Sequence, residues 1–192
     1  MKLSYDDALA LLREHNKNES LVKHGMAVSA AVAAYASKYD GDETLWRVTG
    51  LLHDLDYEEY PTIEEHTLHT AVWLRELGYP EELVYAILAH NDLIGPPRNT
   101  PLAKALYACD ELAGLITATA LVRPTKSVSG LEASSVRKKM KDKAFARGVN
   151  RDDITRGAAD LGVDLNEHIT FVIAAMSAEA DALGLAGTDS DA

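Results

Sequence analysis

Residues 20–38 read SLVKHGMAVSAAVAAYASK, and the spacing of their apolar side chains is decisive for the fold class. Leu21, Val28 and Tyr35 fall on one stripe, at the repeat of an α-helix with one buried face. The same spacing continues through most of the chain, and no run of alternating β-branched residues predicts a strand. We therefore expect an all-α helical bundle. The predicted helices cover residues 4–15, 20–38, 43–54, 64–77, 81–91, 100–121, 131–143, 151–161 and 165–183.

Capping residues indicate where several of these helices begin and end. Ser20 is suited to cap the helix over 20–38. Thr100 followed by Pro101 is typical of a cap and a first helical turn. Gly78 stands where a residue in the left-handed conformation is expected to end a helix.

A chain of 192 residues suffices for one core and is short for two, and it contains neither an internal repeat nor a dividing linker. We expect a single domain over residues 1–186, with a core at 20–122 and a basic helical extension at 123–186. Residues 187–192 are acidic and polar, so they are predicted to form a disordered tail.

The net charge of −11 argues against a partner that is an extended nucleic acid, because such partners select for a basic surface. The charge is unevenly distributed, since residues 123–156 contain ten Lys or Arg against four acids. That segment carries +6 and the remainder of the chain −17. A local basic patch suits a small anionic ligand. A basic helix face that is simply solvated fits the pattern equally well.

Other classes of protein are disfavoured by the apolar content and the single cysteine. The Ala-rich stretches are too short or too polar to span a bilayer, so we expect no membrane partner. The first residues turn acidic at once without an apolar signal segment, which predicts a cytoplasmic protein. Cys109 cannot form an internal disulfide and is interpreted as a small buried hydrophobe.

Four imidazoles and two carboxylates fall on apolar helix faces or at helix ends, where such groups need a partner. A buried imidazole must be hydrogen-bonded or bound to a metal, and a buried carboxylate is costly unless a cation neutralises it. One such residue alone is more often a hydrogen-bonded core residue. Six ligands directed inward from separate helices, however, suit two divalent metals. The residues are His24, His53, Asp54, either His66 or His69, His90 and Asp110.

Two further histidines and both tryptophans are interpreted as structural. His15 lies in a polar stretch, and His168 lies in a terminal helix without a matching ligand. Trp46 and Trp73 are predicted to pack against neighbouring helices, since aromatic platforms for single-stranded nucleic acids accompany a basic groove.

The order of the six residues resembles the two-metal form of the HD superfamily, whose pattern is H, HD, H, H and D on successive helices. The stretches 50–54, 86–90 and 107–111 are similar to the family's motifs. Within the superfamily the chain is similar to small bacterial phosphohydrolases, such as the HD-type diadenosine tetraphosphate hydrolases. It is less similar to the cyclic-dinucleotide phosphodiesterases, because Tyr57 stands where that branch usually has a lysine. Residues 122–149 resemble an extension found in small HD hydrolases without a settled substrate.

The resemblance implies an HD-domain helical bundle that binds two divalent transition-metal ions, with Fe, Mn, Co, Ni and Zn as candidates. It implies that Asp54 bridges the metals, with His53 beside it at the catalytic centre. His24, His53 and Asp110 are expected mainly on one metal, and His66 and His90 on the other. His66 is favoured over His69, because the family's middle histidine usually precedes a small residue four positions later. Thr70 meets that condition for His66, whereas Trp73 does not for His69.

The implied activity is that of a metal-dependent phosphohydrolase. It is expected to cleave a phosphate ester or anhydride of a small anionic substrate, for which a nucleotide is one candidate, with a metal-activated hydroxide. Arg123 and Lys126 are candidates for binding a phosphate that does not react, with helix-end solvation as the alternative.

Two other functions compete with hydrolysis. Some HD relatives hold mixed-valent di-iron with the same six ligands and act as oxygenases on small phosphonate or polyol-like substrates. A binding or sensory module with a degenerate site is disfavoured by the intact ligand set. The substrate and the oligomeric state stay open at this stage.

Overall fold

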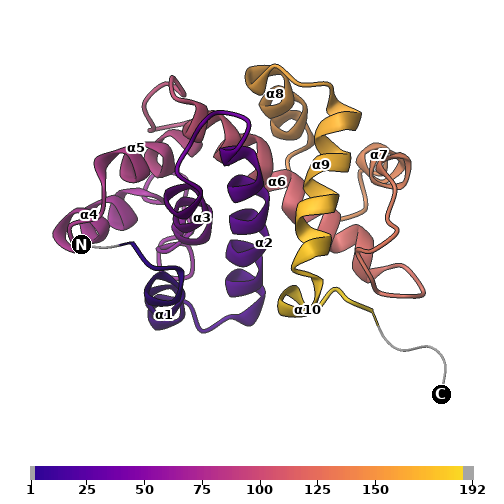
Figure 1. The fold of residues 1–192 in the computed structure, drawn as a ribbon, viewed down its shortest axis with the longest axis horizontal. Coiled ribbons are helices and arrows are strands. Elements are labelled where there is room, and N and C mark those ends of the chain that lie inside the picture. The colour runs from indigo at the N-terminus through magenta and orange to yellow at the C-terminus, as the bar shows by residue number, and fades with distance from the viewer. Residues whose placement is uncertain (1–2, 188–192) are drawn as a thin grey trace. The chain divides into compact units, whose positions relative to one another are not determined.

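The computed structural model describes residues 3–187, and within this range it is all-α with ten helices, as the sequence predicts (Figure 1). The chain divides into two compact units, one ending at Tyr107 and the other beginning at Ala108. Helix α6 (Pro101–Leu121) contains the boundary between the two units. The extent of the single domain over 1–186 stays a prediction. Residues 188–192 of the predicted tail lie outside the described residues.

The first unit is built around α3, which contacts α1, α2 and α5. Helices α2 and α3 lie side by side (Figure 1) because glycines let their backbones approach closely. A Cβ atom on Gly25 would stand 2.8 Å from the Leu51 carbonyl oxygen, and one on Gly50 would stand 2.8 Å from the Ser29 Cα atom. The helices of this unit, before α6, are α1 (Tyr5–His15), α2 (Glu19–Ala36), α3 (Glu43–Leu52), α4 (Leu68–Glu76) and α5 (Glu81–His90).

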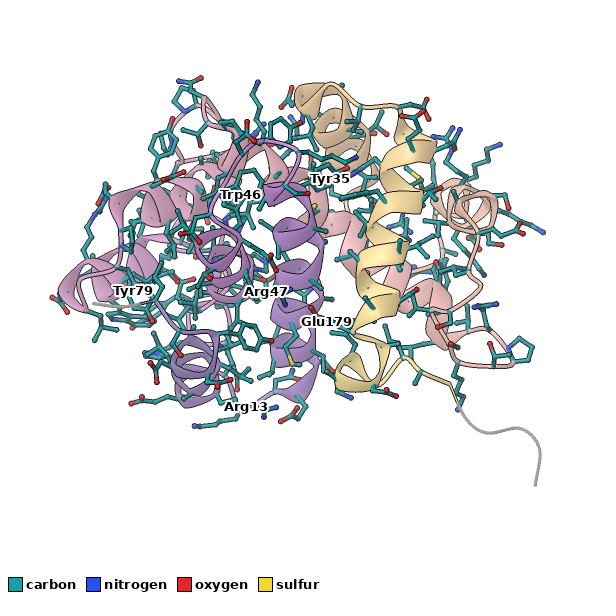
Figure 2. The ribbon with its side chains drawn as sticks, in the orientation of Figure 1. Arg13, Tyr35, Trp46, Arg47, Tyr79 and Glu179 are labelled. Carbon is teal, nitrogen blue, oxygen red and sulfur yellow. The ribbon has the colours of Figure 1, made fainter. Side chains whose placement is uncertain are left out.

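Aromatic side chains fill the spaces beside these helices. Trp46 of α3, labelled in Figure 2, is buried. Its ring stacks on that of Tyr39, with the centroids 5.9 Å apart. Trp73 packs against the ring of His15 at 4.4 Å. Both tryptophans therefore have the packing role that the sequence predicts for them. His15 has a packing role too, through its contact with Trp73.

The structure confirms two of the predicted helix ends and corrects a third. Gly78 has a φ of 77° after α4, and the Thr100 hydroxyl accepts the Ala103 N–H at the start of α6. Ser20, however, is not the cap of α2. Asn18 caps the helix with its side-chain oxygen, which accepts the Ser20 N–H at 2.9 Å. Helix α2 therefore begins one residue earlier than predicted.

Breaks in the backbone shorten or divide two of the predicted helices. The helix predicted over 64–77 begins only at Leu68, because Thr67 has a φ of 76° and turns the chain there. The helix predicted over 165–183 is interrupted at Glu179, whose φ of −115° and ψ of 20° separate α9 from α10. In both places the apolar repeat continues across a break in the backbone, so periodicity alone does not detect it.

The second unit is organised around α9, which contacts α7, α8 and α10. The His168 ring is buried, and its Nε2 atom lies 2.8 Å from the Ala108 carbonyl oxygen, which gives this histidine a structural role. Cys109 is fully buried, as expected, and burial raises the pKa of its thiol. The helices of this unit after α6 are α7 (Ala133–Lys141), α8 (Arg151–Leu161), α9 (Leu165–Ala178) and α10 (Ala180–Leu183).

Over the described part of the chain, no helix combines the length and the apolar character needed to cross a bilayer.

Candidate metal centre

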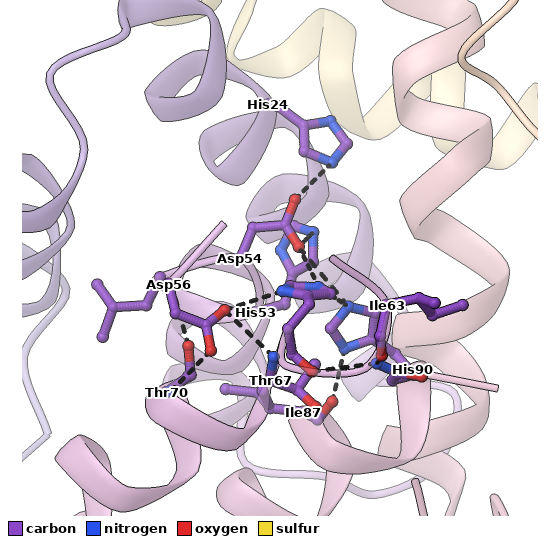
Figure 3. Close-up of polar contacts among 12 residues, drawn as sticks. His24, His53, Asp54, Asp56, Ile63, Thr67, Thr70, Ile87 and His90 are labelled. Carbon is purple, nitrogen blue, oxygen red and sulfur yellow. Dashed lines mark hydrogen bonds and ion pairs between the residues drawn. The ribbon is translucent and has the colours of Figure 1, made fainter. Parts of the chain in front are cut away.

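Five of the six predicted ligands gather in the first unit around the Asp54 carboxylate (Figure 3). Its Oδ1 atom lies 3.1 Å from Nε2 of His66, 3.3 Å from Nε2 of His53 and 3.6 Å from Nε2 of His90. Its Oδ2 atom faces the other way, 3.8 Å from Nε2 of His24. One carboxylate thus presents its two oxygens to different imidazoles.

Local structure brings these side chains to one place. His24 precedes Gly25, at the close approach of α2 to α3. Helix α3 ends at Leu52, so His53 and Asp54 lie in the first turn beyond it. His90 is the last residue of α5. Side chains at helix ends can point along the helix axis, which lets residues from separate helices meet at a single point.

Backbone carbonyls orient two of the rings. The Nδ1 atom of His53 lies 2.8 Å from the Gly50 carbonyl oxygen, and that of His90 lies 2.6 Å from the Ile87 carbonyl oxygen. A carbonyl oxygen only accepts hydrogen bonds, so Nδ1 carries the proton in each neutral ring. The lone pair is then on Nε2, the atom that faces Asp54. Metal-binding histidines are commonly fixed in this way.

Asp56 orients the third ring, and sequence reasoning missed it. Its carboxylate is almost fully buried and lies 2.8 Å from Nδ1 of His66. It also accepts the backbone N–H groups of Thr67 at 3.2 Å and of Thr70 at 2.9 Å. These bonds help to hold Thr67 in its left-handed conformation, which is uncommon for a β-branched residue. The only sequence signal was the position of Asp56 directly after the apolar Leu55, inside a turn that otherwise appears solvated.

Asn91 ties together the two segments that carry His66 and His90, and it was also missed. Its buried amide donates to the carbonyl oxygens of Ile63 at 2.8 Å and His66 at 3.0 Å. Its side-chain oxygen accepts the Leu93 N–H at 2.9 Å. An asparagine immediately after a candidate ligand at a helix end was the available signal.

The electrostatics of the cluster favour a carboxylate surrounded by imidazoles. Burial alone raises the pKa of the Asp54 carboxyl, but the nearby His53 and the other imidazoles that face its oxygens outweigh this effect and hold the pKa well below its usual range. Burial also raises the pKa of Asp56, but hydrogen bonds outweigh this effect and lower the pKa, chiefly the bond with His66. Burial lowers the pKa of His66, but the bonds to Asp54 and Asp56 outweigh this and raise it to about 9.

The donor atoms fit a transition metal. The Nε2 atoms of His66 and His90 lie 3.1 Å apart, and both face Oδ1 of Asp54. In a neutral ring held through Nδ1, the Nε2 atom offers a lone pair, so a cation between the two nitrogens, either a proton or a metal ion, relieves their repulsion. One ligand atom each of His53, Asp54 and His90 lies within 4.8 Å of the others. Imidazole nitrogens with a carboxylate oxygen suit iron, manganese, cobalt, nickel or zinc.

His66 lies in the cluster, whereas the contacts of His69 are elsewhere. The His69 ring stacks on Tyr60 with the centroids 3.6 Å apart and lies 6.0 Å from Trp73. His66 precedes α4 and His69 lies within it, so the two histidines do not share one helix face. The geometry therefore favours His66 as the middle histidine.

The remaining predicted site residues lie in the second unit. Asp110 lies on α6, and its role as a ligand stays a prediction. The Arg123 guanidinium donates to three backbone carbonyls of residues 127–130, so it holds its own loop. Lys126 has a φ of 49° in the same turn. Substrate binding by Arg123 and Lys126 also stays a prediction.

Residues 21–115 match the family model described as HD domain. This segment contains all six predicted ligands, from His24 to Asp110. Neither a curated protein nor a solved structure matches the chain.

Proposed function

Since the chain belongs to the HD superfamily through residues 21–115, we propose that it is a phosphohydrolase acting on a small phosphorylated substrate. Members of this family are generally metal-dependent hydrolases. The observation that carries the proposal is the convergence of three oriented imidazoles on the Asp54 carboxylate. Such a site has the donor types and the supporting hydrogen bonds of a metal centre.

Asp54 is the proposed bridge between two divalent metals. Its Oδ2 atom faces His24 and its Oδ1 atom faces His66 and His90, and this division of its contacts supports the proposed bridge. We assign His24, His53 and Asp110 to one metal, and His66 and His90 to the other. When bound, the two ions would lower the pKa of a shared water and neutralise charge on the phosphoryl oxygens.

The protein's own groups hold this arrangement rigid. The low pKa of Asp54 keeps it a carboxylate, which is the form that binds cations. The carbonyls of Gly50 and Ile87 keep two rings in the tautomer whose Nε2 atom can coordinate. Asp56 does the same for His66 through Nδ1. Pre-oriented ligands reduce the reorganisation that accompanies metal and substrate binding.

The substrate class follows from charge. The basic segment at 123–156 favours a substrate with phosphate groups, and a nucleotide is one candidate. The overall charge of −11 disfavours an extended nucleic acid. We place the activity in the cytoplasm, on the sequence argument alone.

The test is a panel of nucleotides and other phosphate esters and anhydrides, assayed with each candidate metal while oxygen consumption is followed. We expect metal-dependent release of phosphate or a phosphomonoester, and none from the Asp54→Asn variant. Oxygen uptake without phosphate release would replace the hydrolase with an oxygenase. A chain that binds no metal under any loading would refute the proposal.

A further inference from the structure

The basic segment of the second unit surrounds a hollow that the proposed metal centre does not use. The hollow has a volume of about 450 Å³ and is lined by residues between 140 and 152. Three of these residues are basic, Lys143, Arg147 and Arg151, and one is acidic, Asp152. The charged lining therefore carries a net positive charge.

The loop that forms this hollow is held in one shape by hydrogen bonds rather than by regular secondary structure. The Arg151 guanidinium donates to the backbone carbonyls of Phe145, Ala146 and Val149. Ala146 has a φ of 42°, in the region that disfavours residues with a side chain. The Asn150 N–H donates to the Glu111 carboxylate on α6 at 3.0 Å. Arg151 thus stabilises the loop through its backbone, so Lys143 and Arg147 are the basic side chains of the hollow that are available to a ligand.

Lys143 and Arg147 line the hollow without side-chain partners of their own within residues 3–187. Among the described residues, neither side chain forms an ion pair or a hydrogen bond. Asp152 also lines the hollow, but the basic side chains outnumber it, and this excess of positive charge attracts a multiply charged anion. In contrast, an acid pairs with each of Arg13, Arg47, Arg75, Arg98 and Arg156.

We propose that this hollow binds a phosphate group through Lys143 and Arg147. The loop that forms the hollow is anchored to Glu111, the residue after the proposed ligand Asp110 in the sequence. The phosphate belongs either to a part of the substrate that does not react or to a separate anionic effector. The first assignment rests on the proposed function, whereas anion binding by the hollow does not.

Calorimetric titration of the metal-stripped, full-length protein with inorganic pyrophosphate tests the proposal. We expect binding at one site, and binding at least about tenfold weaker in the Lys143→Gln/Arg147→Gln variant, because two charge-assisted contacts are lost. The matched control is Lys138→Gln/Lys141→Gln, which removes the same charge from the same segment but from outside the hollow. It should bind pyrophosphate within about twofold of the wild type, since screened charges contribute little at moderate salt.

Three results would overturn the proposal. They are the absence of pyrophosphate binding by the wild type, normal binding by the hollow variant, and an equal loss in the control variant. The Asp54→Asn protein should bind pyrophosphate like the wild type. A chain that hydrolyses nothing but still binds pyrophosphate at the hollow would therefore defeat the proposed function and leave the anion site intact.

Kinetics on the best substrate then distinguish the two sources of the phosphate. A higher KM with unchanged kcat in Lys143→Gln/Arg147→Gln, together with competitive inhibition of the wild type by pyrophosphate, assigns the hollow to the substrate. An unchanged KM, together with loss of a non-competitive pyrophosphate effect, assigns it to an effector.

Discussion

The histidine cluster of the first unit and the basic hollow of the second both gather charged groups, but they hold them differently. In the cluster, the rings of His53, His66 and His90 are buried, and each is fixed through Nδ1. In the hollow, hydrogen bonds fix the backbone, while the side chains of Lys143 and Arg147 stay exposed. Metal coordination tolerates errors of only a few tenths of an ångström, whereas attraction between ions acts over roughly 8–10 Å. The cluster therefore requires accurately positioned side chains, whereas the hollow does not.

The largest expected effect is at Asp54, the centre of the rigid region. Asp54→Asn keeps the volume of the side chain but removes the charge that lets two cations lie close together. We expect activity to fall by more than about 100-fold and metal content to fall with it, while the protein stays folded. Turnover, metal analysis and thermal unfolding without added metal are the measurements. An active variant with normal metal content would show that Asp54 only stabilises the turn after α3.

His66 and His69 provide the next test, because they are close in sequence and differently placed. His66→Ala should reduce the metal content from two ions toward about one per chain, since it removes a ligand beside Asp54. His69→Ala should leave metal content unchanged and affect only the packing against Tyr60. Metal analysis after mild chelation and reloading compares the two variants. The reverse order would assign the middle ligand to His69.

Asp56 tests whether orientation of a ligand matters as much as its presence. Asp56→Asn removes the charge that fixes Nδ1 of His66 and should weaken metal binding by about 10- to 100-fold. Glu64→Gln, an exposed acid of the following segment, is the control and should leave the affinity unchanged. Competition with a metal indicator measures both. If Asp56→Asn binds metal like the control, Asp56 supports only the backbone of Thr67 and Thr70.

The smallest effects are expected from two glycines, one in each region. Gly50→Ala would bring a Cβ atom within 3 Å of the Ser29 backbone, so we expect a loss of about 1–3 kcal/mol in the free energy of unfolding. Gly148→Ala meets no atom within 4 Å and should change stability by less than about 0.5 kcal/mol. Denaturant unfolding of the two variants measures the difference in packing directly. Equal effects would contradict the tight approach of α2 to α3.

The sequence by itself determined the all-α class, the approximate helices and the residue types of the candidate site. These properties are local, because the helical repeat and the caps at Gly78 and Thr100 depend on neighbours a few positions away. The candidate ligands were also recognisable locally. A histidine or an aspartate on a buried apolar face needs a hydrogen-bond partner or a metal in any tertiary arrangement.

Only the tertiary structure decided which of these groups meet. The position of His66 beside Asp54 depends on the left-handed turn at Thr67, which the helical repeat of the sequence does not predict. The roles of Asp56 and Asn91 exist because separate segments are brought within hydrogen-bond distance. Distances between segments far apart in sequence follow from packing across the whole unit, and the spacing of residues along the chain does not contain them.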